Sequence, residues 1–286
     1  MRSAATRHPA FRGGTSLIAL IGGSGFRDFP FYGPTRSEIV STGWGTTSVR
    51  VGTVNGREVV FLPRHGWEHS IPPHRIDYRA NIAALRELGI RAAIATTAVG
   101  SLRRSLPPGA FLVPDDLIDF TRDRTGKTFF DGQPGAPVVH SDLSRPYSEP
   151  LRQALIGAAT TTGVGIAPAG TYLCTDGPRY ETHAEVRLFA HWGADVVGMT
   201  GVPETPLARE AGIHYAALSV VTNYGAGISP DPLTHADVEA AMRDARAAVF
   251  ALITQAIIRI DDVNLPAIGP GVALPVGPRG EPNHAV

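Results

Sequence analysis

Hydrophobic residues recur along most of the chain with two spacings, one typical of strands and one typical of helices. Short apolar runs with strand character lie at residues 16–23, 90–101, 109–120, 169–177, 194–201 and 214–223. Apolar positions at helical spacing lie at residues 77–89, 149–163, 182–193, 204–212 and 234–260. Residues 47–66 alternate around Asn55-Gly56, which is typical of a β-hairpin turn. Because helical segments separate most strands, the pattern predicts a single α/β domain with a mostly parallel central sheet flanked by helices.

The two ends of the chain lack this periodicity. Residues 1–15 have no repeating pattern and are interpreted as a flexible leader. Residues 263–286 are rich in Pro and Gly, a composition that favours an extended or disordered tail. We therefore assign the domain to residues 16–262 and find no internal repeat or second domain.

Several of the predicted strands end in small or polar residues. These ends are Gly22-Gly23-Ser24, Arg64-His65, Thr96-Thr97-Ala98, Met199-Thr200 and Thr222-Asn223. In a sheet of this kind, ligands bind at the carboxyl ends of the strands. The sequence therefore predicts one polar rim that forms a binding site.

The overall charge narrows the class of ligand. Lys and Arg together number 26, as do Asp and Glu, so the chain has no basic field to hold a polyanion, which disfavours nucleic-acid and membrane-surface binding. The single cysteine, Cys174, excludes an internal disulfide and fits a reducing compartment. The only apolar run near the N-terminus is too short for a signal sequence or a membrane span. We expect a cytoplasmic enzyme.

A glycine-rich turn follows the first predicted strand, in the segment GGSGF at residues 22–26. The dinucleotide-binding pattern fails because Asp28 stands where a third glycine is required, and no phosphate-loop lysine follows. The backbone N–H groups and the Ser24 hydroxyl can still bind an anion. A plain tight turn is the alternative.

The segment PRHGWEHSIPPHR, at residues 63–75, is rich in histidine. The spacing of His65 and His69 raises the alternative of a metal pair on a helix. Pro72-Pro73 favours a loop, however, and no cysteine or matching carboxylate completes a ligand set. Arg64 and His65 at a strand end are better suited to binding an oxyanion, so we predict no metal.

The segment TDGPRYETHAE, at residues 175–185, places Tyr180 and Glu181 just before a predicted helix. One interpretation is an aromatic side chain packed on the core and a carboxylate favoured by the helix dipole. The other is a ring that stacks on a heterocycle and a carboxylate that accepts hydrogen bonds from the edge of that heterocycle. The two residues alone leave both interpretations open.

Six segments resemble the methylthioadenosine phosphorylase branch of the trimeric purine nucleoside phosphorylases. They read IGGSGF, PRHGWEH, DYRANIAALRELG, ATTAVGSLR, DGPRYET and GADVVGMTGVPETPLAREAGIHYAALSVVTN, in consistent order within residues 16–262. The resemblance implies a nucleoside phosphorylase-like fold and a homotrimer, which can pair into a dimer of trimers. It implies that phosphate, a co-substrate, displaces a purine from C1′ of a nucleoside, with no cofactor.

The resemblance also implies roles for individual residues. The phosphate ligands would be Ser24, Arg64, His65, Thr97, the Ala98 backbone and Thr200. Met199 would pack against the sugar and Tyr180 would lie near the base, while Asn223, His65 and Thr200 would contribute directly to catalysis. No protein nucleophile is needed, because phosphate itself attacks a sugar with oxocarbenium character.

Three positions depart from the methylthioadenosine enzymes, which carry aspartates where this chain has Asn223 and Gly225, and a serine where it has Glu181. An amide can donate to O6 of a purine, whereas a carboxylate can only accept. Glu181 can accept from N1–H, which adenine lacks. We therefore predict a 6-oxopurine nucleoside phosphorylase with Glu181, Asn223 and Gly225 at the base.

The 5′ end of the sugar is decided by fewer residues. His235 falls where methylthio-specific enzymes carry an apolar residue, and a histidine there can hydrogen-bond a 5′-hydroxyl; an exposed residue in the first turn of a helix is the alternative. We favour inosine and guanosine as substrates. S-Methyl-5′-thioinosine is the alternative substrate, and methylthioadenosine is the less favoured one.

Overall fold

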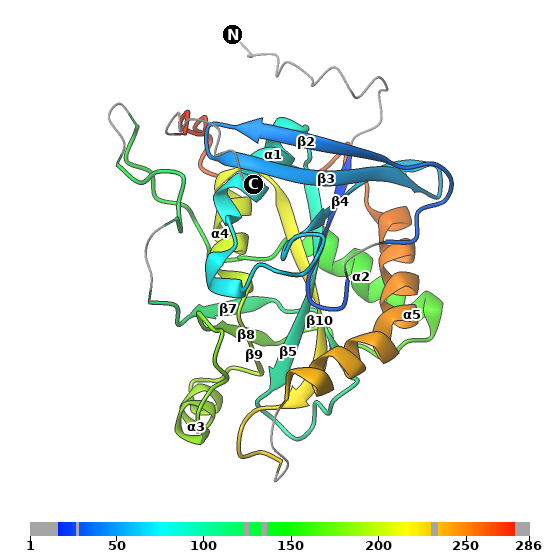
Figure 1. Ribbon diagram of the computed structural model, residues 1–286, viewed down its shortest axis with the longest axis vertical. Helices are drawn as coiled ribbons and strands as arrows, with labels where there is room; N and C mark the ends of the chain where they lie inside the picture. The colour runs from blue at the N-terminus through cyan, green and yellow to red at the C-terminus, as the bar shows by residue number, and fades with distance from the viewer. Residues whose placement is uncertain (1–16, 27–28, 123–125, 133–135, 230–233, 278–286) are drawn as a thin grey trace.

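The structure is a computed structural model that describes residues 17–26, 29–122, 126–132, 136–229 and 234–277. A single mixed sheet forms its centre, with helices on both faces (Figure 1). The strands are β1 (Ile18–Gly22), β2 (Arg36–Thr42), β3 (Gly45–Val54), β4 (Arg57–Pro63), β5 (Ala92–Ser101), β6 (Phe111–Leu112), β7 (Asp116–Asp119), β8 (Thr171–Cys174), β9 (Val196–Gly198) and β10 (His214–Tyr224). The helices are α1 (Tyr78–Glu87), α2 (Glu149–Thr162), α3 (His183–His191), α4 (Gly201–Glu210) and α5 (His235–Arg259), with a short 3-10 helix η1 (Pro73–Arg75). The predicted single α/β domain is confirmed.

The centre of the sheet is parallel. β1 lies between β4 and β5 and pairs with both in parallel, and β10 pairs in parallel with β5. β7, β8 and β9 form a second parallel group, which joins β5 through an antiparallel contact with β9. β2 and β3 extend the other side of the sheet as antiparallel strands beyond β4. The carboxyl ends of β1, β4, β5 and β10 therefore meet at one edge.

Two hydrophobic cores lie on opposite faces of this sheet. Alternate residues of β1 point to opposite sides, as the pleat of a strand requires. Ile18 and Leu20 pack in a cluster with apolar residues of α2 and α5. Ala19 and Ile21 pack in a second cluster with residues of α1 and α4. Because both faces are covered, the central strands are largely apolar, and the few polar side chains within them are small and buried, such as Thr96, Thr97 and Ser219.

Local sequence signals mark several element ends as predicted. The hairpin between β3 and β4 turns at Asn55 and Gly56, whose φ angles are 48° and 77°. α2 ends at Gly163 with φ 71°. α3 begins with a complete capping box, in which Thr182 and Glu185 each accept a hydrogen bond from the backbone N–H of the other. These predictions are confirmed.

Two elements differ from the prediction. Residues 109–120 form two short strands, β6 and β7, rather than one, because Pro114 lies between them and has no backbone N–H to donate to a ladder. β2 was not predicted, because most of its residues are exposed, including Ile39 at 74%. A strand with little burial shows little hydrophobic alternation.

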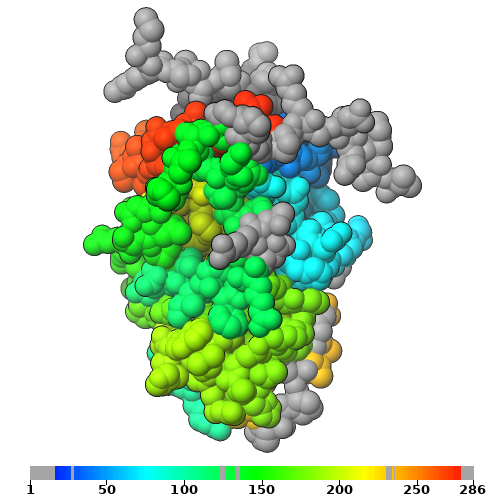
Figure 2. Space-filling view, turned by 90° about the vertical axis from the view of Figure 1, so that its left-hand side faces the viewer, coloured from blue at the N-terminus to red at the C-terminus, as the bar shows by residue number. Residues whose placement is uncertain are grey.

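The Pro/Gly-rich tail is extended and packed as far as residue 277. Arg91 donates to the carbonyl oxygens of Asp262, Val263 and Leu265, and the Trp44 indole donates to the carbonyl of Pro275. Figure 2 shows this part of the tail in red at one end of the molecule and α3 in yellow-green at the other. The predicted leader, residues 1–15, and residues 278–286 lie outside the described residues.

Within the described ranges, no helix is both long enough and apolar enough to cross a membrane.

Candidate active site

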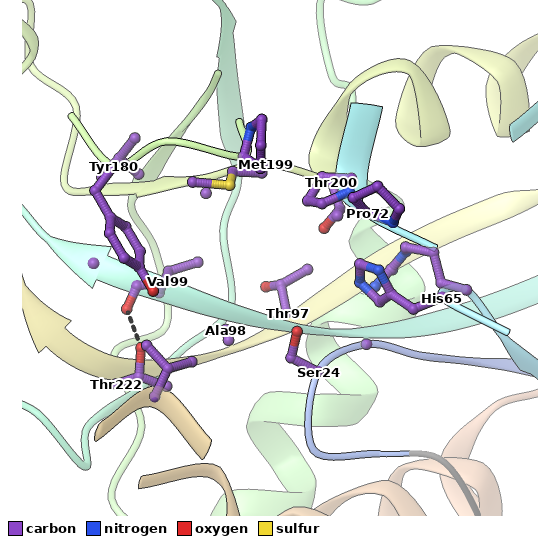
Figure 3. A pocket seen from close by; sticks show the side chains of 18 of the residues that line it. Ser24, His65, Pro72, Thr97, Ala98, Val99, Tyr180, Met199, Thr200 and Thr222 are labelled. Atoms are coloured by element: carbon purple, nitrogen blue, oxygen red, sulfur yellow. Dashed lines mark hydrogen bonds between the residues drawn. The ribbon is translucent and has the colours of Figure 1, made fainter. Parts of the chain in front are cut away.

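A cavity of about 560 Å³ opens where the carboxyl ends of the central strands meet (Figure 3). It brings together most of the residues that the sequence predicted for the site. Those in its lining are Ser24, Arg64, His65, Thr97, Ala98, Tyr180, Glu181, Met199, Thr200 and Asn223. Ser24, His65 and Thr200 lie toward one end of the cavity and Tyr180 and Thr222 toward the other (Figure 3). The predicted polar rim is therefore a single concave site.

The glycine turn after β1 forms part of the cavity wall. The Gly23 N–H donates to the Thr96 hydroxyl at 3.0 Å, which ties the turn to β5. A Cβ atom on Gly23 would lie 2.6 Å from the Thr96 carbonyl oxygen and 2.8 Å from Nη1 of Arg64. Only glycine leaves room for this approach. The turn thus rests directly on the Arg64 guanidinium and presents Ser24 beside it.

Arg64 is buried to 1% exposure, and its guanidinium orientation is fixed. Its Nε and Nη2 each donate to the Glu204 carboxylate at 2.6 Å, and its Nη1 donates to the Thr96 carbonyl at 3.0 Å. Burial alone would lower the pKa of Arg64, but the Glu204 charge outweighs it and holds that pKa above its usual value. An arginine has five N–H groups, so the three bonds found among the described residues leave two. The cavity-lining arginine is therefore a fixed cation.

The histidine-rich segment is a tight loop rather than a helix. His65 Nδ1 lies 2.8 Å from the Ile71 carbonyl, and the Ile71 N–H returns to the His65 carbonyl at 3.1 Å. Because a carbonyl can only accept, Nδ1 carries the hydrogen of this bond. The His65 and His69 rings lie 4.9 Å apart, and His69 Nε2 lies 3.3 Å from the Ser24 hydroxyl. No group of three or more metal-binding side chains occurs in the described part of the chain.

Two threonines complete the same end of the cavity. The Thr97 hydroxyl lies 2.8 Å from that of Ser219 on the neighbouring strand β10. Thr200 is the N-cap residue of α4, and its backbone N–H donates to the Tyr172 hydroxyl at 3.3 Å. Together with Ser24 and Arg64, these groups make an end of the cavity suited to a tetrahedral oxyanion.

The other end of the cavity carries a carboxylate and an amide. The Thr175 hydroxyl donates to Glu181 at 2.9 Å. Burial raises the pKa of Glu181, although hydrogen bonds, including the one from Thr175, oppose this rise. The Asn223 Oδ1 accepts from the Thr222 hydroxyl at 2.7 Å, and Nδ2 donates to the Tyr224 carbonyl at 2.9 Å. These bonds orient the amide, and each of its polar atoms retains capacity for one further bond.

Two predicted site residues are not among the cavity lining that the structure describes. Gly225 does not belong to the cavity lining, because the chain turns away after Asn223 and a Cβ atom on Gly225 would lie 3.2 Å from Val186 of α3. Its predicted place at the base stays a prediction. His235 begins α5, but its side chain lies outside the described residues, so its predicted role stays a prediction.

Sequence reasoning missed several lining residues. They are His69, Ser70, Ile71, Pro72, Pro73, Val99, Gly100, Pro178, Val197, Gly198 and Val238. The positive φ of His69, 54°, is not visible in a sequence, and neither is the side of α5 that faces the site. Pro72 and Pro73 did signal a loop at this position. Their closeness in sequence to His65 was the one indication that this loop forms part of the cavity wall.

Comparisons with known proteins were made for sequence and for structure. Residues 17–258 match the family described as the phosphorylase superfamily. The 6-oxopurine nucleoside phosphorylase of Pyrococcus furiosus is 48% identical over 244 residues, which cover 84% of this chain and 91% of that protein. A probable S-methyl-5′-thioinosine phosphorylase of Methanothermobacter thermautotrophicus is 44% identical over 243 residues, which cover 84% of this chain and 83% of that protein. The solved structure of methylthioadenosine phosphorylase from Schistosoma mansoni with adenine aligns with a TM-score of 0.81 at 32% identity. The alignment covers 85% of this chain and 91% of that one.

Proposed function

Because the chain belongs to the phosphorylase superfamily, we propose that it is a purine nucleoside phosphorylase acting on the 6-oxopurine nucleosides inosine and guanosine. Phosphate attacks C1′ of the sugar, the bond from C1′ to the purine nitrogen breaks, and the products are the free base and ribose 1-phosphate. One observation carries this proposal. A single cavity has groups suited to an oxyanion at one end and, at the other, a carboxylate and an amide suited to the edge of a heterocycle.

In this proposal phosphate binds at the end of the cavity formed by the glycine turn. Arg64 donates its two remaining N–H groups, and Ser24, Thr97 and Thr200 offer hydroxyls. The His65 ring belongs to the same end of the cavity, where the Ile71 carbonyl orients it through Nδ1. The oxygen that attacks then lies beside the sugar, against which Met199 packs, so the reaction gains from proximity and orientation.

At the other end, the base is recognised by complementary donors and acceptors. A 6-oxopurine presents an acceptor at O6 and a donor at N1. The remaining N–H of the Asn223 amide donates to O6, and its oxygen accepts from N7 as the leaving base takes up a proton. The Glu181 carboxylate accepts from N1–H. The Asn223 donor stabilises negative charge that develops at O6 of the purine, and phosphate stabilises the positive charge on the sugar.

The Glu181 contact predicts a pH dependence. Burial raises the pKa of Glu181, so as pH falls this carboxylate gains a proton at a higher pH than an ordinary glutamate does. Once protonated, it loses the charge that strengthens the bond from N1–H, so kcat/KM for inosine should fall on the acid side of the profile. Glu181→Gln should lower kcat/KM by about tenfold, the typical effect of one polar contact to a charged group. Its pH profile should lack the inflection due to Glu181 and keep that due to phosphate.

The comparison of the two profiles is the control. Both enzymes use the same phosphate, so ionisation of phosphate affects them alike. If Glu181→Gln kept the same acid-side inflection as the unaltered protein, Glu181 would not be the titrating contact to the base.

A second candidate substrate is S-methyl-5′-thioinosine, and one observation favours it. Ile71, Pro72 and Val238 make part of the cavity lining apolar, and Val238 lies one turn after the start of α5. A thioether would pack there more favourably than a hydroxyl. The 5′-hydroxyl proposal relies instead on His235.

A substrate screen tests the proposed function against this candidate. The spectrophotometric rates for inosine, guanosine, adenosine and their 5′-methylthio analogues are compared at saturating phosphate. We expect inosine and guanosine to have the highest kcat/KM. Val238→Thr keeps the side-chain shape and adds a hydroxyl; if the 5′ group lies there, it should lower kcat/KM for methylthioinosine about tenfold more than for inosine. A preference for methylthioinosine in the unaltered protein would establish the second function.

We also propose that the protein is a homotrimer, a state that the resemblance implies, with a dimer of trimers as the alternative. Analytical ultracentrifugation distinguishes a monomer, a trimer and a hexamer. A cytoplasmic location stays a prediction based on charge and cysteine content.

A further inference from the structure

Glu204 lies beneath the phosphate end of the cavity and was not among the predicted site residues. It belongs to α4, the helix that follows Thr200, and its side chain is 1% exposed. Its carboxylate accepts two hydrogen bonds from Arg64 and a third from the Tyr215 hydroxyl at 2.6 Å. Glu204 is absent from the cavity lining. It therefore acts on any ligand only through Arg64.

The geometry of these bonds sets the direction of the guanidinium. Glu204 takes the side edge of the planar group, formed by Nε and Nη2. The Thr96 carbonyl takes one hydrogen of Nη1. One hydrogen remains on each Nη atom, and Arg64 belongs to the cavity lining. Without the carboxylate, a long arginine side chain has several other rotamers open to it.

The charge of Glu204 makes an electrostatic role in phosphate attraction untenable. A carboxylate behind an anion site reduces the positive charge that the incoming phosphate meets. What Glu204 contributes is a fixed orientation and the stability of a buried cation, because a charge without a partner is costly to bury. The Tyr215 hydroxyl in turn fixes Glu204 from β10.

We propose that Glu204 is a positioning residue for phosphate binding, and that Tyr215 supports it, so that the relay Tyr215–Glu204–Arg64 aims the guanidinium into the cavity. This inference rests on the proposed function, since phosphate is the ligand in question. A purely structural ion pair is the alternative. The two differ in whether the affinity for phosphate depends on the relay.

Three variants test the relay. Glu204→Gln replaces the second acceptor with a donor that faces an Arg64 N–H. Tyr215→Phe removes only the hydroxyl that donates to Glu204. Tyr147→Phe is the matched control: Tyr147 is buried and stacked 6.2 Å from Tyr215, and the hydrogen bonds found among the described residues include none from it to Glu204. The readouts are the KM for phosphate, the KM for inosine, and the rise in unfolding temperature when inorganic phosphate is added.

We expect Tyr215→Phe to raise the KM for phosphate by about three- to tenfold and Glu204→Gln by at least about 30-fold, since charge-assisted bonds are lost in both. The KM for inosine and the kcat at saturating phosphate should stay within about twofold in Tyr215→Phe. Tyr147→Phe should match the unaltered protein in every readout. If Glu204→Gln fails to fold, the phosphate KM of Tyr215→Phe alone decides whether the relay positions Arg64.

Unchanged phosphate affinity in Tyr215→Phe, or equal changes in both KM values, would overturn the positioning role. The unaltered protein separates this outcome from a failure of the proposed function. If inorganic phosphate neither stabilised the unaltered protein nor supported base release, the phosphorylase proposal itself would be wrong. If phosphate did both and the Tyr215→Phe affinity were normal, only the relay would be wrong.

Discussion

Replacement of Arg64 by alanine should raise the KM for phosphate by at least about 100-fold, because two charge-assisted hydrogen bonds of roughly 1.5–3 kcal/mol each are lost. The KM for inosine should change by less than about threefold, since the guanidinium serves the phosphate end of the cavity. Initial rates measured over a matrix of phosphate and inosine concentrations give both constants. No other single substitution at the phosphate end removes as many donors from the site.

The variant needs a control for folding, because Arg64→Ala leaves the Glu204 carboxylate buried without its partner. Such a change typically costs about 3–5 kcal/mol of stability. Arg64→Lys keeps a cation beside Glu204 but cannot hold the carboxylate and reach phosphate as the planar fork does. It should retain the fold, as judged by thermal unfolding, and still bind phosphate weakly. Equal increases in the two KM values for both variants would argue against a phosphate role for Arg64.

Replacement of Asn223 by aspartate should weaken the preference for inosine over adenosine. The substitution keeps the shape of the side chain but replaces the donor that faces O6 with a carboxylate oxygen. Inosine kcat/KM should fall by at least about tenfold, because one mismatched polar contact costs roughly 1–3 kcal/mol. The kcat/KM for adenosine should fall less or rise, since its 6-amino group donates to a carboxylate. Glu181 would still limit a full conversion to adenosine.

The ratio of inosine to adenosine kcat/KM separates base recognition from local damage. Asn223 Nδ2 donates to the Tyr224 carbonyl, and a carboxylate oxygen there would face that carbonyl at the same position. A distorted strand end would lower kcat/KM for both substrates alike. An unchanged ratio would therefore mean that Asn223 only shapes the end of β10.

The sequence predicted the site best where a local pattern and the topology agree. The carboxyl ends of the central parallel strands meet at one edge, so Ser24, His65 and Thr97 could be grouped before any coordinates were known. The Asn55-Gly56 turn likewise depends only on neighbouring residues. Such features need short-range information alone.

Other features depend on contacts that are distant in sequence. The bonds between Arg64 and Glu204 join residues 140 positions apart, and a single sequence does not show which cation a glutamate on a helix will meet. A charged residue among the buried positions of α4 was the one available signal. Gly225 is next but one to Asn223, yet it lies outside the cavity lining because the chain turns toward α3 between them. Closeness in sequence did not imply a shared face.

The most direct test of the account measures whether base release requires phosphate. The purified protein is incubated with inosine in phosphate-free buffer, in phosphate and in arsenate, and hypoxanthine is followed by absorbance. The account predicts release only with phosphate or arsenate, and with phosphate it predicts one ribose 1-phosphate for each hypoxanthine. Equal release in phosphate-free buffer, with free ribose as the sugar product, would contradict it and identify a hydrolase.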